Sequence, residues 1–99
     1  MSAKWTETAR AQLAEYAEFI ERASMAAADR WVAKMLAAAE LAARFPLMGH
    51  AVPDFDDENV QQVIVYSHRL IYRIAGKDIE ILRVWHGSRL LRAEDIDDE

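Results

Sequence analysis

The sequence predicts an α+β domain in which a helical hairpin precedes an antiparallel sheet. Apolar residues recur with the period of an α-helix over residues 9–45, and three β-rich segments follow between residues 60 and 85. The two kinds of element do not alternate along the chain. Helices first and strands later are typical of an α+β fold rather than of a parallel α/β sheet.

The 99 residues form one domain, because the chain is too short for two independent cores. A hydrophobic content of 53% with 29% charged residues is typical of a globular chain. We place the domain at residues 1–93 and expect the acidic residues 94–99 to be a disordered tail. The absence of cysteine excludes disulfides, thiolate zinc sites and a cysteine nucleophile.

The N-terminal segment lacks the basic region and the continuous apolar run of a signal peptide. The alanine-rich stretch at residues 25–45 is interrupted by charged residues too often for a membrane span. We therefore expect a cytoplasmic protein with no membrane partner.

The helical hairpin can be placed residue by residue. Trp5 and its neighbours suit a short first strand, and Thr6 can cap the helix that follows. Ser24 can end that helix and cap a second one, which should stop near Arg44 because Pro46 cannot continue it. The face that the first helix buries follows spacings of four, three, four and three residues: Ala9, Leu13, Tyr16, Ile20 and Ala23.

The second half of the chain reads as a loop and three strands. Residues 46–59 hold both prolines and an acidic run without any period, which predicts the main loop. The segments 60–66, 69–74 and 79–85 are then strands of a three-stranded antiparallel meander. A turn at residues 75–78 sets the register of the last hairpin by pairing Ile74 with Ile79. It also pairs Tyr72 with Ile81, Arg73 with Glu80 and Ile71 with Leu82.

The last hairpin also gathers positive charge in a chain whose formal net charge is −5. In a regular ladder Arg69 faces Val84 and lies ~7–8 Å from His86 on the same face. Arg83 points to the opposite face unless a bulge intervenes. One interpretation is a phosphate-binding arginine beside an acid–base histidine. The other, favoured on spacing alone, is a solvated edge cluster or one that pairs with the acidic tail.

The sequence shows no pattern typical of a metal site or of a phosphate-binding loop. The three histidines, His50, His68 and His86, have no short ligand spacing, and no phosphate-cradling glycine loop occurs. We therefore expect neither a metal ion nor a cofactor.

The order of several motifs resembles the RelE/ParE superfamily of type II toxin–antitoxin toxins. The motifs are "WTETARAQL" from Trp5, "FPLMGHAVPDF" after the helical hairpin, "HRLIYRI" and "IEILRVWHGSRLL". The resemblance spans Trp5 to about Leu91. It implies a curved antiparallel sheet behind the hairpin and a cognate antitoxin that holds the toxin inactive in a hetero-oligomer. We expect an acidic or amphipathic antitoxin segment to cover the basic hairpin.

One branch of the superfamily cleaves mRNA in the ribosome. The positions that match its catalytic residues are Asp54, Arg69 and His86, for attack of a 2′-hydroxyl on the adjacent phosphate. Gly87 stands where the nuclease has a tyrosine, and the acidic balance is atypical of that branch.

The ParE-like branch inhibits DNA gyrase and is not a nuclease. The "RVWHGSR" ending resembles this branch, and it implies a target-facing surface at Arg83, His86 and Arg89. Gln61 and Gln62 replace an arginine–glutamate pair that is usual in the family, and paired arginines of the nuclease. We therefore expect a gyrase inhibitor, with a ribosome-dependent endoribonuclease as the alternative. A degenerate toxin kept as an antitoxin-binding module is the third interpretation.

Overall fold

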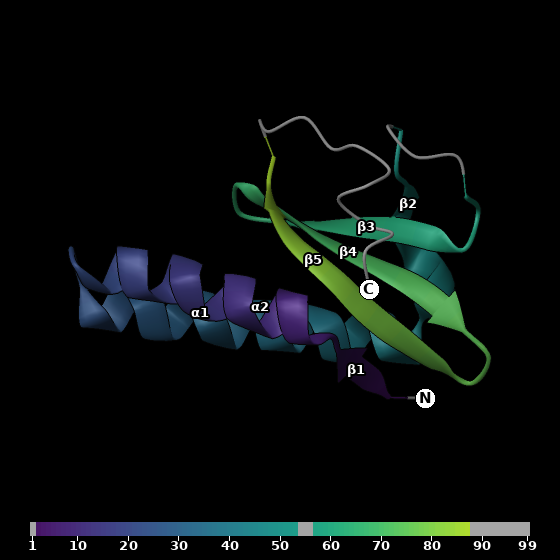
Figure 1. Cartoon of the computed structure of the whole chain (residues 1–99), viewed down its shortest axis with the longest axis horizontal. Coiled ribbons are helices and arrows are strands. Elements are labelled where there is room, and N and C mark those ends of the chain that lie inside the picture. The colour runs from purple at the N-terminus through teal and green to yellow at the C-terminus, as the bar shows by residue number, and fades with distance from the viewer. Residues whose placement is uncertain (1, 54–56, 88–99) are drawn as a thin grey trace.

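The computed structural model describes residues 2–53 and 57–87. Within these ranges the two helices precede most of the strands, as Figure 1 shows, and the predicted α+β fold is confirmed. The elements in chain order are β1 (Ala3–Trp5), α1 (Glu7–Glu21), α2 (Met25–Arg44), the 3-10 turn η1 (Pro46–Met48), β2 (His50–Ala51), β3 (Val60–Val65), β4 (His68–Ala75) and β5 (Asp78–His86).

Both helices begin at the predicted capping residues. The Thr6 hydroxyl oxygen accepts a hydrogen bond from the Ala9 N–H at 3.1 Å, and the Ser24 hydroxyl accepts one from the Ala27 N–H at the same distance. The Thr6 hydroxyl also donates to the Ile81 carbonyl at 2.9 Å. This one side chain therefore starts α1 and ties it to β5.

The sheet has five strands in the order β1-β5-β4-β3-β2. β1 lies parallel to β5, and the other neighbours are antiparallel, so the predicted first strand and three-stranded meander are both present. The stretch predicted as loop differs, because it contains η1 and the two-residue strand β2. β2 pairs only with Gln61 and Gln62. Two residues are too few to show an alternating pattern in the sequence.

The register of the β4–β5 hairpin is correct near the turn and wrong beyond it. The pairs Ile74–Ile79, Arg73–Glu80 and Tyr72–Ile81 are confirmed. A shift between Ile71 and Tyr72 then places Ile71 opposite Arg83 instead of Leu82, and Arg69 opposite Trp85 instead of Val84. The extra residue in β5 is a β-bulge, which moves every later side chain of that strand to the other face.

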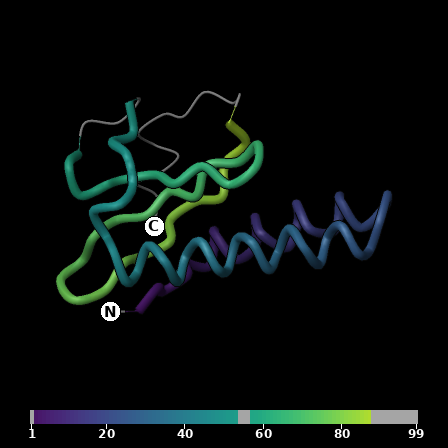
Figure 2. Tube along the Cα trace, turned by 180° about the vertical axis from the view of Figure 1, so that it is seen from behind, coloured from purple at the N-terminus to yellow at the C-terminus, as the bar shows by residue number. Residues whose placement is uncertain are grey.

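Hydrophobic residues are buried on both faces of the sheet. The helical hairpin covers one face, and its α1–α2 turn projects beyond the sheet (Figure 2). Ala39, Ala42 and Ala43 of α2 are fully buried there, and their small side chains allow the helix to approach the strands closely. The second cluster lies on the opposite face and consists of Val52, Val60, Ile71, Leu82 and Trp85. The bulge is what allows Leu82 and Trp85 to join this same cluster.

Tyr72 connects the main core to the segment after α2. Its buried hydroxyl donates to the Pro46 carbonyl at 2.7 Å and lies 3.1 Å from the side-chain oxygen of Gln61. Gly49 passes so close that a Cβ there would lie 2.5 Å from this hydroxyl. Glycine is therefore required at residue 49 for space.

We expect Tyr72→Phe to lower the free energy of unfolding by about 1–2 kcal/mol, because it leaves the partly buried Pro46 carbonyl without this donor. Urea denaturation of both proteins measures the difference. Tyr66→Phe is the matched control, because the Tyr66 side chain is 64% exposed. Equal losses in the two variants would show that the Tyr72 hydroxyl is not the source of the effect.

Candidate functional site

The structure separates the residues that the sequence grouped as one basic site. Arg69 and Arg83 lie on the sheet face that points away from the helices, because the bulge brings Arg83 to the face of Arg69. His86 pairs with His68 and lies on the helix side. The expectation that Arg69 and His86 share a face, with Arg83 opposite, is therefore wrong. Asp54 and Arg89 lie outside the described residues.

The two arginines are buried rather than presented to solvent. The Arg83 side chain is 2% exposed and donates from Nη1 to the Leu82 carbonyl at 2.6 Å. Arg69 is 8% exposed and donates from Nη1 to the Gln62 side-chain oxygen at 3.4 Å. Gln62 in turn donates from Nε2 to the Ala51 carbonyl at 3.4 Å. The contacts of Arg69, Gln62 and Ala51 connect β4, β3 and β2 on one face of the sheet.

Gln61 and Gln62 therefore have structural contacts in this chain. Gln62 lies between Arg69 and β2, whereas the side-chain oxygen of Gln61 lies 3.1 Å from the Tyr72 hydroxyl. The sequence showed only that these residues depart from the family pattern. An uncharged amide can both accept from a guanidinium and donate to a carbonyl, which a second arginine cannot do.

His68 is a residue that sequence reasoning left aside. Its ring is 4.5 Å from that of Tyr16 and 5.3 Å from both Trp31 and His86, measured between ring centroids. All three contacts are edge-on. The cluster joins α1, α2, β4 and β5 at one end of the sheet, and its only sequence signal was the position of His68 at the start of a strand.

His68 is half-buried, but both of its ring nitrogens are shielded from solvent. Neither ring nitrogen has a hydrogen-bond partner within the described part of the chain, nor does the indole nitrogen of Trp31. Burial lowers the pKa of His68, and the nearby His86 lowers it further. The neutral imidazole is thus favoured in the folded protein.

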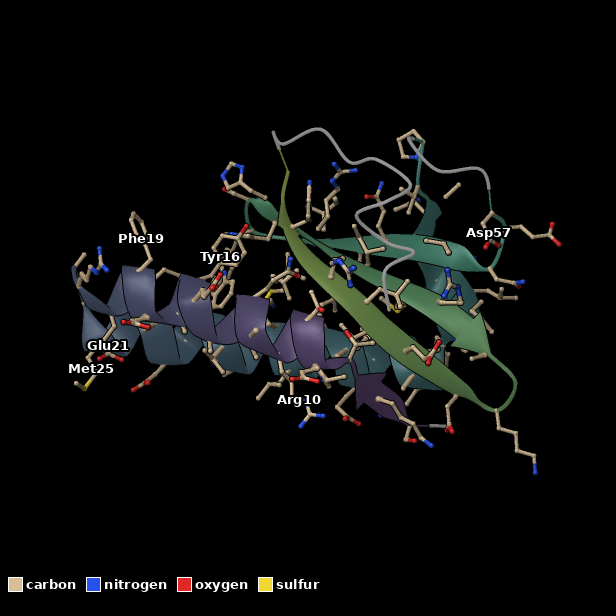
Figure 3. The ribbon with its side chains drawn as sticks, in the orientation of Figure 1. Arg10, Tyr16, Phe19, Glu21, Met25 and Asp57 are labelled. Atoms are coloured by element: carbon tan, nitrogen blue, oxygen red, sulfur yellow. The ribbon has the colours of Figure 1, made fainter. Side chains whose placement is uncertain are left out.

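A groove of about 530 Å³ opens beside this cluster, between α1 and the ends of β4 and β5. Tyr16 and Phe19 project from α1 on this side (Figure 3), and Phe19 is 68% exposed. Glu15, His68 and His86 also line it. No group of three metal-ligating side chains occurs among residues 2–53 and 57–87. The groove is suited to bind a side chain or a peptide.

Comparison with known proteins shows which family this chain belongs to. The family model described as the ParE toxin of the type II toxin–antitoxin system parDE matches residues 3–91. The chain belongs to the ParE toxin family. The match includes both helices and all five strands.

A solved structure of the chromosomal ParDE TA system from P. aeruginosa has the same fold as this ParE-family chain. The TM-score is 0.70 and the sequence identity 24%, over 87% of this chain and 95% of that one. A search of curated proteins finds no match. No helix in the described part of the chain is long and apolar enough to cross a membrane.

Proposed function

We propose that this ParE-family chain is the toxin of a type II toxin–antitoxin module, that a cognate antitoxin neutralises it, and that it acts by binding DNA gyrase in the cytoplasm. Membership of the ParE toxin family supports the toxin role. The observation that carries the choice of target is the separation of Arg69 from His86 by the sheet itself.

An endoribonuclease needs its acid and its charge stabiliser at the same phosphate. In this chain the Arg69 guanidinium is buried against Gln62, whereas His86 is exposed on the opposite face. The two side chains cannot both contact one phosphate in this arrangement. This favours a protein-binding inhibitor over the ribosome-dependent nuclease that would use Asp54, Arg69 and His86.

The target-facing surface in this proposal contains His86 and, beyond the described residues, Arg89. Arg83 contributes by holding the bulged end of β5 in place, because its side chain is buried. A loss of toxicity on mutating Arg83 would therefore report on the strand as much as on the contact.

The proposal predicts that the purified chain inhibits DNA supercoiling by purified gyrase and that the antitoxin restores it. In cells, induction without antitoxin should reduce DNA synthesis first, followed by a DNA-damage response. Pulse labelling of DNA and protein synthesis measures the order of events.

Two other outcomes would contradict this function. If protein synthesis falls first and His86→Gln reduces mRNA cleavage by about 10²–10⁴, the nuclease mechanism holds instead. If growth continues although the antitoxin binds, the chain is a degenerate toxin kept as a binding module.

A further inference from the structure

Two histidines lie side by side at the open end of the β4–β5 hairpin. His68 is the first residue of β4 and His86 is the last residue of β5, and the two are direct partners in the strand register. The Gly87 N–H donates to the Ser67 carbonyl at 2.8 Å, so the neighbouring pair His68–His86 exchanges no backbone hydrogen bonds. Side chains of such a pair lie closest together. The strand pairing, and not the spacing in the sequence, brings these two residues together.

The two imidazole rings are separated by a distance at which they can share one metal ion. Their centroids are 5.3 Å apart and their planes are inclined at 80°. Two imidazoles bound to one Zn²⁺ at a tetrahedral angle, with Zn–N bonds of about 2.0–2.1 Å, have centroids about 5 Å apart. The separation of the rings therefore has to change little when an ion binds.

The ring of His68 is fixed by its neighbours, but its nitrogens have no partner. Edge-on contacts place its centroid 4.5 Å from that of Tyr16 and 5.3 Å from that of Trp31. Neither nitrogen has a hydrogen-bond partner in the described part of the chain, although both are shielded from solvent. Burying unpaired polar atoms costs free energy, and a metal ion bonded to one of these nitrogens would offset part of that cost. A ligand that is fixed before binding also loses little freedom when the ion binds.

The groove of about 530 Å³ beside α1 gives an ion access to this pair. His86 is exposed and lines the groove together with His68, and Glu15 lines it from α1. Within residues 2–53 and 57–87 no third metal-ligating side chain joins the two histidines. The remaining coordination positions of a bound ion would therefore open into the groove, where water or a side chain of a binding partner can occupy them.

A pair of imidazole nitrogens selects the kind of ion. Mg²⁺ and Ca²⁺ prefer oxygen ligands, whereas imidazole suits Zn²⁺, Cu²⁺ and Ni²⁺. Zn²⁺ has no geometric preference from its d electrons, so it accepts the angle between ligands that two paired strands impose.

We propose that His68 and His86 together bind one Zn²⁺ ion at the open end of the β4–β5 hairpin. The ion cross-links the first residue of β4 to the last residue of β5, and its remaining coordination positions face the groove. The site does not rest on the proposed toxin role, because it follows from the pairing of these two strands alone.

The test is calorimetric titration of ZnCl₂ into the purified full-length chain, prepared without a histidine tag and freed of metal with a chelator. One ion should bind per chain. His86→Gln and His68→Gln should each weaken binding by at least about tenfold, because each removes one of the two protein ligands. His86 is exposed, so its variant should fold as the wild type does. His50→Gln is the matched control, since His50 is an exposed histidine on β2 and its loss should leave the zinc affinity unchanged.

Two further measurements report on the site itself. X-ray absorption at the zinc edge should show two imidazole nitrogens at about 2.0–2.1 Å. Hydrogen exchange of backbone amides at the ends of β4 and β5 should slow when Zn²⁺ is added to the wild type, but not when it is added to His86→Gln.

Several results would contradict the site. A large excess of Mg²⁺ should leave zinc binding unchanged, so zinc that Mg²⁺ displaces would be bound by carboxylates and the proposal would be wrong. Absence of binding, or equal zinc affinity in the wild type, His68→Gln and His86→Gln, would also overturn it. One ion for every two chains would place the site between copies instead. The supercoiling assay with the metal-free chain tests the proposed function separately.

Discussion

Replacing Arg83 by alanine is expected to lower the free energy of unfolding by about 3 kcal/mol. The side chain is 2% exposed, and its Nη1 donates to the Leu82 carbonyl at 2.6 Å. The substitution removes the buried aliphatic part of the Arg83 side chain, and it leaves the Leu82 carbonyl without its charged hydrogen-bond donor. The cost should therefore be that of a core substitution, although the residue is an arginine on a strand near the C-terminus.

Thermal or urea unfolding of Arg83→Ala tests this directly. Lys77→Ala is the control, because Lys77 is an exposed cation in the β4–β5 turn and its loss should change stability by less than about 0.5 kcal/mol. Any loss of growth arrest in Arg83→Ala would then follow from fewer folded molecules. If the variant were as stable as the wild type but no longer toxic, Arg83 would contact the target directly. Its side chain would then have to become exposed when the toxin binds that target.

The sequence predicted most of the fold because the relevant signals are local. Thr6 and Ser24 mark helix starts through their own hydrogen bonds, and Pro46 forces the end of α2 through its missing donor. The β4–β5 turn was placed correctly because Ile74 and Ile79 flank a glycine with a φ of 63°. Each of these features depends on a few neighbouring residues.

The faces on which Arg69, Arg83 and His86 lie could not be predicted in the same way. They depend on a β-bulge at Leu82, and no local sequence pattern marks that residue. Leu82 is an apolar residue in a β-rich segment, and the segment would look the same in the sequence if Leu82 were regularly paired. The bulge is favoured by packing that involves distant parts of the chain, since Leu82 and Trp85 join Val52 and Val60 in the second cluster. Once it forms, Arg83 is on the face of Arg69, and His86 is beside His68 instead.

His68→Phe is expected to stabilise the protein by about 2 kcal/mol at neutral pH. Both His68 ring nitrogens are buried without a hydrogen-bond partner in the described structure, and burying such polar atoms costs free energy. Phenylalanine keeps the edge-on contacts with Tyr16 and Trp31 and removes the two nitrogens. The neighbouring groove of about 530 Å³ gives the larger ring space to settle.

The same substitution should change the response of stability to acid. Burial and the nearby His86 lower the pKa of His68 in the folded state below its ordinary value of 6.5. The unfolded chain therefore binds a proton at a higher pH than the folded chain does. The contribution of neutral His68 to the free energy of unfolding is fully present above about pH 6.5. It is lost as the pH falls from there to the pKa of His68 in the folded protein, because protonation then favours the unfolded chain.

Unfolding midpoints measured between pH 7.5 and 5 should therefore fall less steeply for His68→Phe than for the wild type. Glu15, Tyr16 and His86 face this site, so His86→Gln is measured in parallel to separate the second histidine. His50→Phe removes an exposed histidine from β2 and should leave the slope unchanged. A wild-type slope retained in His68→Phe would show that His68 gains a hydrogen-bond partner in solution and is not the acid-sensitive group.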